Sequence, residues 1–134
     1  MFVTMSTEPY VFSDGFDRLF LEELYSGDTR TAEEIFGTSL AQVELSLELA
    51  EIESRSEDTD RLRRVIHHVK PLFGYMGLLS VQDSAQQLED LCRGERDMRI
   101  VRSAFEEFRN IVQDALIRVR SEQSRLHRFN NRRA

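Results

Sequence analysis

Hydrophobic residues recur every three to four positions along most of the chain, which is the spacing of one face of an α-helix. No stretch alternates hydrophobic and polar residues over a useful length, so no β-strand is predicted. The spacing predicts a short helix from about 14 to 25 and four longer helices over about 28–53, 59–77, 80–92 and 97 into the 120s. We therefore expect an all-α fold, an antiparallel up-down four-helix bundle with the short N-terminal helix over one end or side.

The first two predicted helices differ in the width of their hydrophobic face. The expected N-cap of the short helix is Ser13 or Asp14, and its expected inward face consists of Phe16, Leu19, Phe20 and Leu24. In the second helix the hydrophobic arc extends beyond the main face to Leu45, Leu49 and Ile52. We expect this helix to pack between two neighbours or against the short helix. The protein is expected to be a monomer, with a dimer through this wide face as the alternative.

The central predicted helix carries a second stripe, which is not hydrophobic. Its hydrophobic face consists of Leu62, Val65, Ile66, Val69, Leu72, Phe73 and Met76. At about 100° per residue, a separate stripe at i, i+3, i+7 and i+10 holds His67, Lys70, Gly74 and Gly77. An interior proline costs a helix about 3 kcal/mol and a glycine about 1 kcal/mol, so Pro71 and the glycines need a reason. We expect the glycines to leave open space for a partner and Pro71 to bend the helix at His67 or leave its carbonyl to water.

Length and charge limit the possible functions. With 134 residues the chain is the size of one domain, in which we expect an N-terminal arm at about 1–13 and a basic C-terminal tail at about 127–134. The net charge of −6 argues against nucleic acid as a partner, because phosphate contacts need a basic face. No segment approaches the roughly 18 apolar residues of a membrane span, and the lone Cys92 is expected to be buried. These features predict a cytoplasmic protein without a membrane partner.

His67 and Lys70 together have the chemistry to carry a phosphoryl group. A neutral imidazole has a nucleophilic ring nitrogen near neutral pH, and a lysine one helical turn away can place its ammonium beside phosphoryl oxygens. Phosphoryl transfer needs mainly in-line positioning and charge neutralisation, so these residues form half of a site. The chain has no P-loop, no kinase glycine-rich loop and no metal-site spacing around His67. We therefore expect no metal, no cofactor and no enzymatic use of ATP.

The segment HHVKPLFGYMGL resembles the motif of the histidine-containing phosphotransfer (HPt) domain of multistep two-component phosphorelays. In that motif a phospho-accepting histidine is followed by lysine at +3 and glycines at +7 and +10. The likeness extends from FDRLFLEELYSGDTRTAEEIF to the final helix. It implies that His67 accepts the phosphoryl group and Lys70 stabilises its charge, and that a receiver domain approaches over Gly74 and Gly77. Pro71 replaces the small residue more usual after the lysine. Many members place a glutamine near the histidine on the following helix, for which the candidates are Gln86, Gln87 and Glu89.

The resemblance implies a phosphocarrier in signal transduction, which accepts phosphate from the aspartyl phosphate of one receiver domain and passes it to another. The implied partners are receiver domains of response regulators and of a hybrid histidine kinase, with Mg²⁺ held by the partner receiver. Arg63, one turn before His67, is expected to help steer an acidic receiver face, and Pro71 to lie in the partner-binding surface. Two alternatives are a helical module that binds a receiver without carrying phosphate and a phosphoacceptor fragment of a sensor histidine kinase. That kinase class usually has an acidic residue where this chain has His68.

Overall fold

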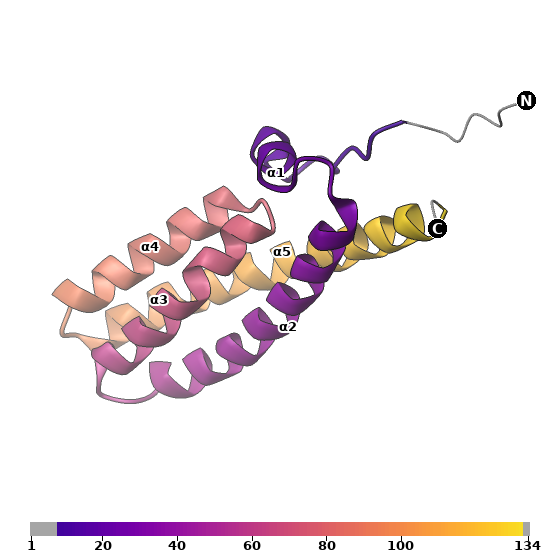
Figure 1. Ribbon diagram of the computed structural model, residues 1–134. Coiled ribbons are helices and arrows are strands. Elements are labelled where there is room, and N and C mark those ends of the chain that lie inside the picture. Colours follow the sequence, from indigo (N-terminus) through magenta and orange to yellow (C-terminus); the bar gives the residue numbers. More distant parts are fainter. Residues whose placement is uncertain (1–7, 133–134) are drawn as a thin grey trace, which may run out of the picture.

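A computed structural model describes residues 8–132, which form five α-helices and no strand. The helices are α1 (Arg18–Tyr25), α2 (Thr29–Ser54), α3 (Thr59–Tyr75), α4 (Leu79–Gly94) and α5 (Met98–Arg132). In Figure 1 the four long helices lie side by side, and α3 packs on α2 and α4 while α5 packs on the same two helices. The described part of the chain is therefore an all-helical bundle, as the hydrophobic spacing predicts.

The hydrophobic core lies between the long helices. Each of them contributes large side chains that are almost completely buried, among them Phe36 of α2, Phe73 of α3 and Phe105 of α5. The predicted inward face of α3 is confirmed, with Val65 and Leu72 partly buried at its margin. Because burying one large aliphatic or aromatic side chain stabilises a fold by about 1.5–3 kcal/mol, this face fixes the rotation of α3 about its own axis.

The ends of α3 are fixed by local interactions. Asp58 is the N-cap, and its side chain accepts a hydrogen bond from the backbone N–H of Asp60 at 3.0 Å. The helix continues through Pro71 and ends before Gly77, which has a φ of +67°. The Leu78 N–H donates to the Phe73 carbonyl and the Gly77 N–H to the Gly74 carbonyl, both at 2.9 Å. This pair of hydrogen bonds is the Schellman arrangement, so Gly77 terminates the helix instead of lying on it.

The prediction for α1 is wrong in its cap and in its face. The helix begins at Arg18 after Asp17, and neither Ser13 nor Asp14 is its N-cap. The side chain of Asp17 accepts a hydrogen bond from the Leu79 N–H at 2.9 Å, and the Asp17 N–H donates to the Gly77 carbonyl at 2.9 Å. Asp17 therefore ties the start of α1 to the turn between α3 and α4.

This docking decides which side of α1 is buried. Leu21 and Tyr25 face the core, and the Tyr25 hydroxyl donates to the Tyr75 carbonyl at 2.6 Å. Leu19 is 82% exposed, and Phe20 and Leu24 are exposed as well. Of the predicted inward face only Phe16 is buried, and it lies before the helix. A helix of two turns carries too little local signal to set its own rotation, so its tertiary contacts set it.

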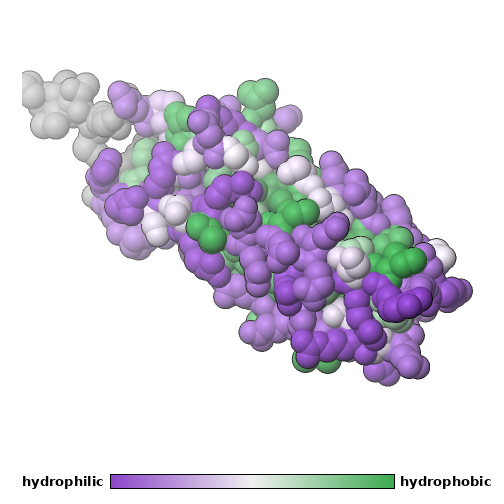
Figure 2. Space-filling model, turned by 180° about the vertical axis from the view of Figure 1, so that it is seen from behind, coloured by the Kyte–Doolittle hydropathy of each residue, from purple (hydrophilic) through white to green (hydrophobic). Residues whose placement is uncertain are grey.

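The second helix packs as expected between two neighbours, because α2 lies against both α3 and α5. The outer part of its wide hydrophobic arc stays outside this packing, since Leu45, Leu49 and Ile52 are 63%, 47% and 66% exposed. Figure 2 shows the rear of the molecule, where hydrophilic residues cover most of the surface and hydrophobic residues form separate patches. A dimer through the exposed stripe of α2 stays a prediction.

One end of the molecule is built by α2, α5 and the segment before α1. The beginning of α2 and the end of α5 extend beyond α3 and α4 (Figure 1), and residues 8–17 lie against them. Glu122 of α5 is 1% exposed and accepts hydrogen bonds from the Tyr10 hydroxyl at 2.8 Å and from the Ser13 N–H at 3.0 Å. Arg125 forms an ion pair with the same carboxylate at 2.9 Å.

The last turns of α5 are helical where a basic tail was expected. Asn130 is buried and donates to the Thr29 carbonyl at 3.0 Å and to the Glu33 carboxylate at 2.7 Å. His127, though exposed, lies 2.8 Å from the other oxygen of Glu33. These contacts with α2 hold α5 in helical form to Arg132, so the expected tail does not begin at 127.

Candidate functional site

His67 projects from α3 with a side chain that is 56% exposed. Its Nδ1 atom lies 2.5 Å from Oε1 of Glu89, a fully buried residue of α4. A carboxylate can only accept hydrogen bonds, so Nδ1 carries the hydrogen and donates it to Glu89. In the neutral ring this leaves the lone pair on Nε2, and no residue of the described chain hydrogen-bonds to that atom. The contact with Glu89 therefore selects the tautomer in which the free nitrogen is the nucleophile.

The Glu89 carboxylate stays ionised in this environment. Burial opposes its ionisation, but the hydrogen bonds from Lys70 and His67 and the positive charge of Lys70 outweigh the burial, so the pKa of Glu89 lies below its ordinary value. The site thus contains a fixed negative charge at the inner nitrogen of the imidazole.

Lys70 lies one turn after His67 and is only 20% exposed. Its Nζ atom is 2.8 Å from Oε2 of Glu89 and 2.6 Å from Oε1 of Gln86. Sequence reasoning left Gln86, Gln87 and Glu89 open as the residue near the histidine. The structure selects Glu89 for His67 and assigns Gln86 to Lys70, while Gln87 is exposed and forms no hydrogen bond with either residue.

Arg93 also reaches the site and was not considered in the sequence analysis. Its Nη2 atom is 3.4 Å from Oε1 of Glu89 and its Nη1 atom is 3.2 Å from Asp90, and the side chain is 53% exposed. Glu89 and Arg93 are four residues apart on α4, a spacing that favours an ion pair on one helix face. That spacing was the available signal. It could not show that the same carboxylate faces His67.

Gly74 and Gly77 do not leave open space beside His67, so that geometric expectation is wrong. A Cβ at Gly74 would lie 3.1 Å from Oε1 of Gln82, and one at Gly77 would lie 2.6 Å from Cγ of Leu21. Both glycines are buried. They allow α4 and α1 to approach α3 closely. Direct contact of either glycine with a partner stays a prediction.

The remaining predicted residues lie around His67 on the surface of α3. Pro71 is exposed, and His68 is exposed with its ring centroid 6.2 Å from that of His67. Arg63 is partly buried, and its Nε atom is 3.3 Å from Asp60. The partner-binding roles of Pro71 and Arg63 stay predictions.

A helical bundle that presents a histidine to solvent, with its inner nitrogen hydrogen-bonded to a buried carboxylate and a lysine beside it, has the architecture of a histidine-based phosphotransfer module. The model of the Hpt domain family matches residues 30–122, which is more than half of the chain, and the chain belongs to this family. Hpt domains transfer phosphoryl groups through histidine in two-component phosphorelays and interact there with receiver domains. No curated protein and no solved structure gives a significant match.

None of the helices between residues 8 and 132 is both long and apolar enough to cross a membrane. No group of three or more His, Cys, Asp or Glu side chains in the same range is arranged to hold a metal ion. The hydrogen bonds of His67 and Lys70 described above join side chains of α3 and α4.

Proposed function

We propose that His67 is the phosphoacceptor of this protein and that its Nε2 atom takes a phosphoryl group from the aspartyl phosphate of one receiver domain and delivers it to another. The observation that carries the proposal is the hydrogen bond from Nδ1 of His67 to the buried Glu89. It directs the nucleophilic lone pair to the solvent-facing side of the ring.

The transfer needs no proton to be moved. The lone pair of Nε2 attacks phosphorus, the bond between phosphorus and the aspartyl oxygen breaks, and the aspartate leaves as a carboxylate. The hydrogen on Nδ1 stays in place, so the phosphorylated ring becomes a cation. The negative charge of Glu89 then faces this new positive charge, and stabilisation of charge that develops during the reaction lowers the barrier to transfer onto His67.

Lys70 supplies the mobile positive charge for the phosphoryl oxygens. Its ammonium has three donors, of which Glu89 and Gln86 engage two. The third can turn to the phosphoryl group while the flexible stem stays anchored.

The other half of the reaction belongs to the partner. We propose a phosphocarrier that does not bind ATP itself, with Mg²⁺ held in the receiver domains of response regulators and of a hybrid histidine kinase. The protein would act as a cytoplasmic monomer whose four long helices run antiparallel. Pro71, Arg63 and the surface around His67 would meet the receiver.

The test is phosphotransfer from a panel of phosphorylated receiver domains. Wild-type protein is expected to gain an acid-labile, base-stable adduct, and ³¹P–¹H NMR is expected to place phosphorus on Nε2 of His67. His67→Ala should remove the adduct. His68→Ala is the matched control, because His68 is the adjacent exposed histidine, and it should label like wild type.

Two results would overturn the proposal: label that persists in His67→Ala, or a wild-type protein that binds receivers without gaining phosphate. The last result would establish the receiver-binding module without phosphate transfer. Binding is measured in the same samples by calorimetry, so these outcomes are distinguishable.

A further inference from the structure

A second concave site lies at the end of the molecule formed by α5 and the segment before α1. It is a hollow of about 330 Å³ between residues 8–11 and the last three turns of α5. This end of α5 lies outside the region matched by the Hpt family model, which ends at residue 122. The hollow has the volume of a small ligand site, at the lower end of the usual range of about 300–1,000 Å³.

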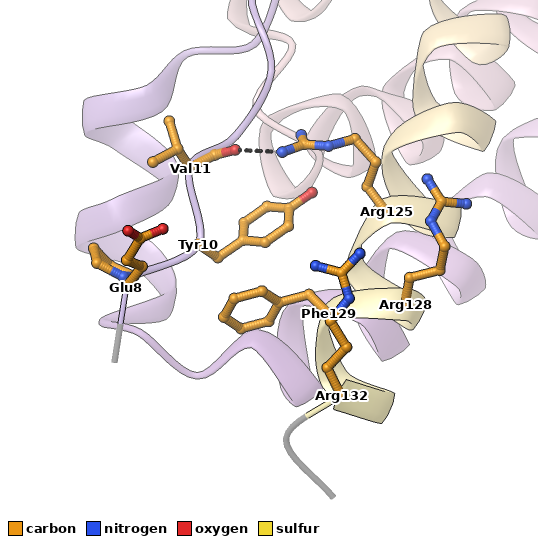
Figure 3. Close-up of a pocket in the computed structure, with 8 residues that line it drawn as sticks. Glu8, Tyr10, Val11, Arg125, Arg128, Phe129 and Arg132 are labelled. Carbon is orange, nitrogen blue, oxygen red and sulfur yellow. Dashed lines mark hydrogen bonds between the residues drawn. The ribbon is translucent and has the colours of Figure 1, made fainter. Parts of the chain in front are cut away.

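Three arginines of α5 line this hollow (Figure 3), with successive members three and four residues apart: Arg125, Arg128 and Arg132. Arg125 is neutralised by Glu122 and donates to the Val11 carbonyl at 3.0 Å. Arg128 and Arg132 form no ion pair with any residue between 8 and 132. Because like charges four residues apart on a helix repel each other, this uncompensated pair of charges is unfavourable for the helix itself. Glu8, at the rim, is the one acidic lining residue.

Two aromatic rings complete the lining. The rings of Tyr10 and Phe129 meet edge to face with their centroids 5.1 Å apart. The guanidinium carbon of Arg125 lies 4.9 Å from the centroid of the Tyr10 ring. Tyr10 is held in place by its hydrogen bond to the buried Glu122, so the aromatic wall is anchored to α5.

The negative end of the helix dipole does not account for all three arginines. Its effect is confined to the last turn, in which Arg132 is the basic residue. Arg128 and Arg125 lie about one and two turns earlier, respectively. A guanidinium pair at the mouth of a hollow is, however, well suited to a phosphate group, since each guanidinium can donate two parallel hydrogen bonds to its oxygens.

We propose that this hollow is an anion site that binds the phosphate group of a small molecule through Arg128 and Arg132, with the rings of Tyr10 and Phe129 beside it. The phosphate could be inorganic or part of a nucleoside monophosphate, and the second source would also use the aromatic wall. A nucleic acid is disfavoured because the basic surface is limited to this hollow, Glu8 lies at its rim and the chain carries a net charge of −6. The inference is independent of the proposed phosphotransfer at His67.

The experiment is a titration of the full-length ¹⁵N-labelled protein with inorganic phosphate and with adenosine monophosphate at constant ionic strength. The side-chain Nε–H signals of Arg128 and Arg132 and the amide signals of Tyr10 and Phe129 are expected to shift and saturate. A tighter affinity for the nucleotide would identify the aromatic wall as part of the site, and equal affinities would assign binding to the phosphate alone.

The variants separate a built site from general attraction of anions. The double variant Arg128→Gln and Arg132→Gln should weaken binding by about tenfold or more, because both charge-assisted contacts are lost. Replacing the same two residues by lysine keeps the charge but removes the paired donors, and should give a smaller loss. Arg118→Gln is the matched control, an exposed arginine of the same helix, and should bind like wild type.

Several results would overturn the inference. One is a set of shifts that grows linearly without saturation or is reproduced by chloride, which would show ionic screening only. Another is equal affinity in wild type and the double glutamine variant when circular dichroism shows both to be folded. A third is saturation confined to Lys70 and its neighbours, and a fourth is a short DNA duplex that binds the same arginines more tightly than the nucleotide does.

Discussion

Replacing Glu89 tests the central element of the proposed mechanism. In Glu89→Leu the Nδ1 atom of His67 loses its acceptor and the ring is free to place its hydrogen on either nitrogen. The variant also removes the negative charge that would face the phosphorylated imidazole. Glu89→Gln keeps an oxygen that can accept from Nδ1 but carries no charge, so the pair of variants separates the orienting hydrogen bond from the charge.

The magnitude follows from the contacts. A hydrogen bond to a charged group is worth about 1.5–3 kcal/mol, and each 1.36 kcal/mol corresponds to tenfold in rate. Loss of the 2.5 Å contact between His67 and Glu89 should therefore slow transfer to Glu89→Leu by about tenfold to hundredfold. Glu89→Gln should recover most of the loss, leaving a deficit of about threefold to tenfold, because the acceptor is retained and the charge is not.

The assay is single-turnover transfer from a phosphorylated receiver by rapid quench, with the tautomer of His67 read by ¹⁵N NMR of the imidazole. Asp90→Asn is the matched control, since Asp90 is the neighbouring exposed acid that pairs with Arg93. It should transfer at the wild-type rate. The reasoning is refuted if Glu89→Leu transfers as fast as wild type, or if the leucine and glutamine variants are equally slow while the hydrogen stays on Nδ1 in both.

Three further predictions concern stability and reactivity. Gly77→Ala should destabilise the fold by about 1–3 kcal/mol in urea unfolding, because the φ of +67° and the contact with Leu21 both oppose a Cβ. The control Gly94→Ala should be neutral or slightly stabilising, because a Cβ there would have nothing within 4 Å. Equal effects of the two substitutions would contradict the account of Gly77. The Cys92 thiol should react slowly with Ellman's reagent in native protein and rapidly in urea, because burial raises its pKa to about 11; rapid native labelling would show an open site. The folded pKa of Glu89 lies below its ordinary value of 4.5, so its contribution to stability is present above pH 4.5 and lost as pH falls through the folded pKa. Between pH 7 and 3 the melting temperature should therefore fall more steeply for wild type than for Glu89→Leu. Parallel curves of melting temperature against pH would speak against the linkage.

The positions of the long helices were predictable because their signals are local. Asp58 can cap α3 through its own side chain, and the hydrophobic face of α3 is set by spacing within one helix. The histidine and lysine of the candidate site were found in the same way, because a separation of three residues on a helix places them on neighbouring parts of one surface.

The acceptor of the Nδ1 hydrogen could not be chosen from the sequence. Glu89 is separated from His67 by 22 positions, and Gln86 and Gln87 lie close to it on the same helix. Only the rotation of α4 against α3 decides which of these three side chains faces the imidazole. The same reasoning applies to Arg93, whose pairing with Glu89 is local but whose place beside the histidine depends on the packing of two helices.

The sequence by itself determined that this protein is a set of amphipathic helices with a histidine and a lysine on one exposed stripe, because helical spacing fixes which residues share a face. The tertiary structure alone decided that Glu89 orients His67, that Leu21 covers Gly77 and that α1 turns Leu19 to solvent. It also decided that Asn130 holds the end of α5 on α2. Each of these contacts joins segments far apart in the chain, and their relative position depends on the summed burial of the whole core rather than on any local pattern.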